Sequence, residues 1–141
     1  MRCLRIAITF IAIAAAIPLM SFTPAAVPDP IAEWSLSAQA AVVAAGMPPL
    51  RTPITFAILH LAMYDAVNAV TRDRQPYAVA PKVPRPASTV AAATEAGYRT
   101  LLAEVPSQKA ALDSTYHRLR ASMPETQETI NGIAAGLHNT G

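Results

Sequence analysis

The stretch from His60 to Ala69 constrains the fold most, because it combines a helical period with an almost entirely apolar surface. At about 100° per residue, four polar side chains fall within one quarter of the helix circumference. These polar residues are His60, Tyr64, Asn68 and Thr71. Apolar residues cover the rest, so we expect other elements to surround this helix. Its polar side chains then need partners inside the protein or at a pocket wall.

A metal site is one interpretation of this helix, since residues four apart converge on one side. Asp65, however, points about 80° or more away from the line formed by His60 and Tyr64. No second histidine-bearing motif accompanies them. We therefore interpret His60, Tyr64, Asp65 and Asn68 as a structural polar seam, and we expect neither metal ligands nor catalytic residues in this chain.

The N-terminus is typical of an export signal, because two arginines precede an unbroken apolar run from Ile6 to Ile17. The run has about a dozen residues, fewer than the roughly 20 that a membrane-spanning helix needs, so an uncleaved anchor is the weaker alternative. We expect residues 1–26 to be a signal peptide that is cut between Thr23 and Val27. The mature protein is then periplasmic or secreted, with no stable membrane span.

Removing the signal takes two of the 11 basic residues and none of the 9 acidic ones, so the mature chain is neutral. Its charge gives no argument for nucleic acid as a partner. Cys3 is the only cysteine and is lost too, which excludes a disulfide. Alanine dominates the remaining chain and removes little area from water, at about 25 cal/mol per Å². The composition predicts a thin core and a chain that forms part of something larger.

The apolar periods predict an all-α fold in which five helices form a partial bundle. The predicted helices span residues 30–45, 53–70, 88–104, 107–122 and 125–138. Residues 27–141 thus form one helical domain, within which residues 71–87 hold four prolines and predict an extended surface connection. Because only a short loop joins the first two helices, we expect them to pack antiparallel.

Local signals place the helix ends. Asp29-Pro30 and Thr52-Pro53 each predict an N-cap followed by proline at the first helical position, and Gly46 predicts a C-terminal stop. Ser88 predicts the third N-cap, and the spacing from Ser122 to Glu125 predicts a capping box before the fifth helix.

Three glycines lie inside predicted helices. Gly97 indicates either a close neighbouring backbone or a glycine that is merely tolerated, at a cost of about 1 kcal/mol. Gly132 and Gly136 have the small-x-x-x-small spacing that marks close helix packing in a soluble protein. The apolar side of this last helix is predicted at Ile130, Ile133, Ala134 and Leu137.

The remaining polar groups give little sign of chemistry. The proline-rich connection holds two basic pairs, which can meet an anion but which we interpret as keeping a loop soluble. These pairs are Arg72 with Arg74 and Lys82 with Arg85. His117 and His138 are expected to be solvated. No nucleophile elbow, phosphate-binding glycine loop or dinucleotide fingerprint is present in the sequence.

Several segments together resemble the N-terminal helical region of bacterial vanadium-dependent haloperoxidase-related proteins, which belong to the type 2 phosphatidic acid phosphatase superfamily. The segments are Trp34, Pro53, Leu61-Ala-Met-Tyr-Asp-Ala-Val-Asn-Ala-Val70, Tyr77, Ala91-Ala-Ala93 and Gln108-Lys-Ala-Ala-Leu-Asp113. The resemblance extends from about Ile31 to Leu137, and Ala-Met-Tyr-Asp-Ala-Val-Asn is its most specific part. Ser35 departs from the family, which tends to have asparagine after the tryptophan.

The resemblance implies a catalytic pocket that binds vanadate or phosphate with one lysine, two arginines, a Ser-Gly pair and a histidine. Preorganised cations stabilise the negative charge of vanadate or phosphate. In the family these groups lie downstream of the matched region, so no cofactor is expected in this chain. Lys82-Val-Pro-Arg85-Pro86 is too closely spaced for the family's motif, and no Ser-Gly-His is present.

Two functions follow as expectations. The first is a non-catalytic N-terminal portion of an exported haloperoxidase-like or acid-phosphatase-like protein, inactive alone, whose partner is the missing C-terminal catalytic bundle. The apolar period still runs at Leu137, which by itself leaves both a truncated chain and a last helix that simply frays open. The resemblance favours a truncated product or fragment, because family members continue this helix into the catalytic bundle. The alternative is a free-standing periplasmic helical binding or interaction module.

Overall fold

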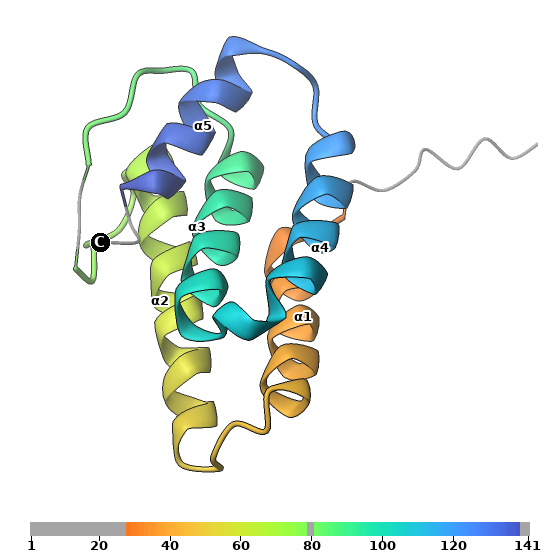
Figure 1. The fold of residues 1–141 in the computed structure, drawn as a ribbon. Coiled ribbons are helices and arrows are strands. Elements are labelled where there is room, and N and C mark those ends of the chain that lie inside the picture. Colours follow the sequence, from red (N-terminus) through yellow and green to blue (C-terminus); the bar gives the residue numbers. More distant parts are fainter. Residues whose placement is uncertain (1–27, 79–80, 139–141) are drawn as a thin grey trace, which may run out of the picture.

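The computed structural model describes residues 28–78 and 81–138, which form an all-α bundle (Figure 1). Its helices are α1 (Pro30–Ala44), α2 (Arg51–Thr71), α3 (Thr89–Glu104), α4 (Lys109–Ala121) and α5 (Gln127–Leu137), with a short 3-10 helix η1 (Pro106–Gln108) before α4. No strand occurs in these two ranges. The all-α prediction is confirmed, whereas the predicted signal peptide lies outside the described residues.

Three of the predicted helix ends are formed as expected. The Asp29 carboxylate accepts a hydrogen bond from the Ile31 amide at 3.0 Å, and the Ser88 hydroxyl accepts one from the Ala91 amide at 3.2 Å. Both side chains satisfy an amide that has no partner within its own helix. Gly46 ends the first helical segment with a φ of 60°, a left-handed conformation that glycine adopts without a steric cost.

Two predicted helix starts are wrong. α2 begins at Arg51 rather than at residue 53, and Pro53 lies inside its first turn, where a missing amide costs no intrahelical bond. The capping box from Ser122 to Glu125 does not form, because the Thr126 hydroxyl instead accepts from the Thr129 amide at 3.3 Å. α5 therefore begins at Gln127.

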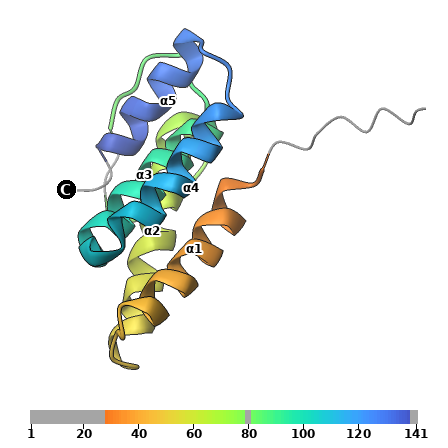
Figure 2. The same ribbon diagram turned by 45° about the vertical axis from the view of Figure 1, so that its right-hand side comes forward.

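α3 is the central helix, and it contacts the other four (Figures 1 and 2). Residues 91–97 are all buried, and most of them are alanine or glycine. Small side chains let several helix backbones approach one axis closely. Larger buried side chains complete the core around this centre: Trp34, Leu59, Met63, Leu101, Leu112 and Leu119.

The three helical glycines mark close approaches to other helices. A Cβ atom on Gly97 would lie 2.5 Å from Cδ1 of Trp34, so the indole ring of α1 rests directly on α3. On Gly136 it would lie 2.6 Å from the Ala92 carbonyl oxygen, and on Gly132 it would overlap the Ser88 carbonyl. The predicted close packing through Gly132 and Gly136 is confirmed, with α3 as the partner.

The predicted apolar side of α5 is wrong in part, because the helix buries small residues against α3 and leaves Ile130 and Leu137 exposed, whereas Ile133 packs against the core. Its buried residues are Thr129, Asn131, Gly132, Ala135 and Gly136. Ile130 is 54% exposed and Leu137 is 44% exposed. We name the side formed by Ile130, Ile133, Ala134 and Leu137 the α5 stripe.

α2 is not surrounded, contrary to expectation. Its buried side carries Leu59, Met63 and Ala66, whereas Ile54 is 44% and Ile58 is 39% exposed on the outer side. The outer residues of the first half follow a helical period, and we name them the α2 stripe: Ile54, Ala57, Ile58 and Leu61. Among the described residues, only α2 is long and apolar enough to cross a membrane, as the core helix of a soluble protein also can be.

Candidate functional site

The buried members of the polar seam bind the backbone of the proline-rich connection. Asp65 is 3% exposed, and its two carboxylate oxygens accept from the Tyr77 amide at 2.6 Å and the Ala78 amide at 2.7 Å. The Asn68 side chain donates to the Arg74 carbonyl at 2.8 Å and accepts from the Arg74 amide at 3.0 Å. These four bonds fold the connection back over the second half of α2.

Tyr64 of the seam and Thr71, both exposed on α2, add further hydrogen bonds to the connection. The Tyr64 hydroxyl donates to the Gln75 carbonyl at 2.8 Å, and the Thr71 hydroxyl donates to the Asp73 carboxylate at 2.6 Å. The bond from Thr71 is the main reason that the pKa of Asp73 lies below its usual range. The seam therefore positions residues 73–78.

His60 does not join Asp65 in a common site. It is exposed, its Nε2 lies 3.5 Å from the Ser35 hydroxyl, and its ring lies 6.4 Å from that of Phe56. Asp65 faces the connection instead. Over residues 28–78 and 81–138, no group of three or more His, Cys, Asp or Glu side chains is placed to hold a metal ion.

A shallow groove of about 190 Å³ lies beside the seam, between the start of α1 and the second half of α2. Three apolar side chains line it, those of Ile31, Met63 and Val67, together with six polar residues: His60, Tyr64, Asn68, Thr71, Asp73 and Arg74. The groove can hold a small apolar group, such as one aliphatic side chain, with few polar contacts to orient it.

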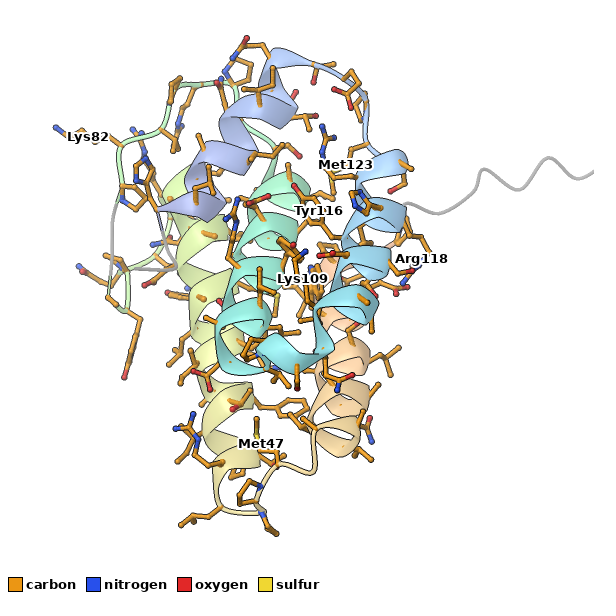
Figure 3. All side chains as sticks on the ribbon, in the orientation of Figure 1. Met47, Lys82, Lys109, Tyr116, Arg118 and Met123 are labelled. Carbon is orange, nitrogen blue, oxygen red and sulfur yellow. The ribbon has the colours of Figure 1, made fainter. Side chains whose placement is uncertain are left out.

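The structure also contains a buried polar cluster that the sequence analysis missed. Glu95 of α3 is 2% exposed, and its carboxylate accepts from Arg99 Nε at 2.8 Å and from the Tyr116 hydroxyl of α4 at 2.7 Å. Figure 3 shows Tyr116 between these two helices. Burial and the bond to Glu95 raise the pKa of Tyr116 to about 12.

A second set of hydrogen bonds, centred on Asp113, continues this cluster along α4. The Tyr98 hydroxyl donates to Asp113 at 2.7 Å, and Lys109 donates to the other oxygen of the same carboxylate at 2.6 Å. Lys109 first, and then Tyr98, hold the pKa of Asp113 below its usual range. The rings of Tyr98 and Tyr116 lie 4.5 Å apart, close enough for an offset contact.

This cluster joins helices. Both oxygens of each carboxylate are engaged, so the groups stabilise the contact between α3 and α4. One sequence signal was available, since Arg99 follows Glu95 by four residues within an alanine-rich helix. No family model, curated protein or solved structure matches this chain.

Proposed function

We propose that this chain is the non-catalytic N-terminal helical portion of an exported vanadium haloperoxidase-like or acid-phosphatase-like protein. In this proposal its exposed apolar stripes pack against the catalytic helical bundle of that protein. The family assignment rests on the resemblance of the segments from Trp34 to Asp113. The packing role rests on the helices described above.

The orientation of α5 is the observation that carries the proposal. An amphipathic helix that packs only within its own domain buries its larger apolar side chains. Here Ile130 is 54% exposed, whereas Gly132 and Gly136 face α3. A second helical surface laid against the α5 stripe removes these aliphatic side chains from water, which is favourable at about 25 cal/mol per Å².

The α2 stripe supports the same role. The proline-rich connection covers the second half of α2 through Asp65 and Asn68, but the first half keeps Ile54 and Ile58 exposed. Contiguous exposed apolar side chains of this kind are typical of interaction surfaces.

Neither carboxylate of the cluster between α3 and α4 argues for catalysis by this portion alone. Glu95 and Asp113 are engaged by Tyr116, Tyr98 and their basic neighbours. In the proposal, the oxyanion of the parent enzyme, vanadate or phosphate, is held by residues of the catalytic bundle.

The test begins with the DNA that follows the Gly141 codon. We expect a reading frame there that encodes a Lys, Arg-Pro and Ser-Gly-His series. Combining its product with this chain should give bromide oxidation with vanadate and peroxide, or phosphate ester hydrolysis, whereas this chain alone gives neither. Turnover by this chain alone would contradict the proposal, as would a bundle that is fully active without it.

A free-standing periplasmic binding module is the second candidate, and the groove beside His60 favours it. Val67→Trp fills this groove, whereas Ile130→Glu adds a charge to the α5 stripe. If a small apolar probe such as an anilinonaphthalene dye binds the groove, V67W abolishes binding and I130E leaves it unchanged. The first proposal predicts the opposite result: I130E weakens binding of the probe, and V67W leaves it unchanged.

A further inference from the structure

Three of the four basic residues of the proline-rich connection line one groove in the structure. A groove of about 280 Å³ lies between the end of α2 and the connection, and Arg72, Arg74 and Lys82 line it together with Pro76 and Pro81. Lys82 lines the groove from the connection, and the end of its side chain extends outward, away from the helices (Figure 3). No carboxylate is among the described residues that line this groove.

The pairing of cations differs sharply between this region and the rest of the described chain. Every described lysine or arginine outside the connection forms an ion pair with a carboxylate. The pairs are Arg51–Glu104, Arg99–Glu95, Lys109–Asp113, Arg118–Glu33 and Arg120–Glu125. Within the described chain, none of the four basic residues of the connection has such a partner. Three of these four cations, Arg72, Arg74 and Lys82, line the groove.

Both walls of the groove are held by hydrogen bonds. On one side, Asn68 fixes the backbone of Arg74 through two bonds. On the other, an Arg72 Nη donates to the Val83 carbonyl at 3.2 Å, and an Arg85 Nη donates to the Val70 carbonyl at 2.8 Å. Arg72 itself is held at a φ of 59°. These bonds fix the Arg74 backbone and the Arg72 side chain at the groove.

We infer that this groove binds a phosphate group. Two guanidinium groups and one ammonium group can surround an oxyanion, and a guanidinium offers paired donors that match phosphate oxygens. The group belongs either to a small phosphate compound or to the headgroup of an anionic lipid. This inference does not depend on the proposed function.

Titration of the purified protein with inorganic phosphate, followed by amide chemical shifts in NMR, tests the site. We expect saturable shifts at residues 72–74 and 82 that are absent with chloride at matched ionic strength. Because the cations are exposed, binding is weak and falls several-fold as ionic strength rises from about 0.01 M to about 0.15 M, where the Debye length shortens from about 30 Å to about 8 Å.

A matched pair of double variants separates local binding from overall charge. Arg74→Ala with Lys82→Ala removes two cations of the groove, and Arg51→Ala with Arg118→Ala removes two elsewhere. All four side chains are exposed, so we expect both proteins to keep their helical circular dichroism. The first variant should weaken phosphate binding at least tenfold, and the second less than twofold. Equal weakening in both variants, or no weakening in either, would overturn the inference.

Vesicles distinguish the two sources of the phosphate group. Binding of free phosphate, with no preference for phosphatidylglycerol over phosphatidylcholine vesicles, identifies a soluble phosphate compound. Binding to phosphatidylglycerol vesicles alone, lost in the groove variant and kept in the control, identifies a lipid headgroup. Failure of the chain to bind either probe would refute the site and would leave the proposed packing role untouched.

Discussion

The contact between α3 and α5 and the outer sides of α2 and α5 use opposite kinds of side chain. The contact is built from alanine and glycine, with Gly132 and Gly136 against the backbone of α3. The outer sides hold larger aliphatic residues, among them Ile54, Ile58 and Ile130. At the contact between α3 and α5, burial thus follows side-chain size and fit more than hydrophobicity. Ile54, Ile58 and Ile130 stay exposed, and in the proposed function they pack against a surface outside the domain.

The two sides of α2 should differ most in their contribution to stability. Leu59 is fully buried, so Leu59→Ala should cost about 2–5 kcal/mol, because it removes apolar contacts and leaves a cavity. Ile58 lies on the outer side, and Ile58→Ala should cost within about 0.5 kcal/mol. Urea denaturation followed by circular dichroism measures both. Equal losses would mean that the outer side of α2 is covered in the isolated protein.

The two sides of α5 should show the same contrast with smaller values. Gly132→Ala or Gly136→Ala forces α5 away from the α3 backbone and should cost about 1–3 kcal/mol each. Ile130→Ala changes more volume but, because Ile130 is exposed, should cost within about 0.5 kcal/mol. A larger loss for the isoleucine variant in the same urea experiment would reverse the assigned orientation of α5.

Replacing Asp65 tests whether its hydrogen bonds keep the proline-rich connection over the second half of α2. Asp65→Ala removes the acceptors of the Tyr77 and Ala78 amides and should cost about 1–3 kcal/mol. Hydrogen exchange at residues 74–78 should accelerate, and binding of a hydrophobic dye should rise as the connection loosens. Gln39→Ala, at an exposed position of α1, serves as the control and should change neither. Unchanged hydrogen exchange in the Asp65 variant would show that the seam does not anchor the connection.

The smallest expected effect concerns Tyr116, whose hydroxyl belongs to the buried polar cluster between α3 and α4. The pKa of Tyr116 is raised from its ordinary value of 10.0 to about 12 in the folded protein, by burial first and by Glu95 second. Its contribution to stability is therefore fully present below the unfolded pKa and is lost as pH rises from about 10 toward 12. Tyr116→Phe should lose less stability over this interval, as thermal melts in both proteins would measure. If both proteins lose the same stability over this pH interval, the loss comes from groups other than Tyr116.

The sequence predicted the helices and several of their ends, because caps and glycines act locally. Asp29, Ser88 and Gly46 each need only their own neighbours in the chain to be effective. The orientation of α5 could not be obtained in this way. Its period contains both an aliphatic side and a glycine side, and the choice between them depends on the shape of α3.

The candidate site shows the same division. Asp65 and Asn68 were recognised as side chains in need of partners, but their partners lie on a connection without periodicity, which a helical pattern does not place. Glu95 was overlooked because its partner Tyr116 lies on another helix, 21 residues away. Long-range pairs of this kind depend on packing rather than on spacing.

Photo-cross-linking from position 130 tests the central claim most directly. A benzophenone amino acid replaces Ile130 in the cell that produces the protein, and a second protein carries it at Ser114, an exposed position on α4. We predict that position 130 labels peptides of a helical bundle that carries the Lys, Arg-Pro and Ser-Gly-His series, and that position 114 does not. A chain that stays uncoupled at position 130, or that couples equally from both positions, would contradict the account.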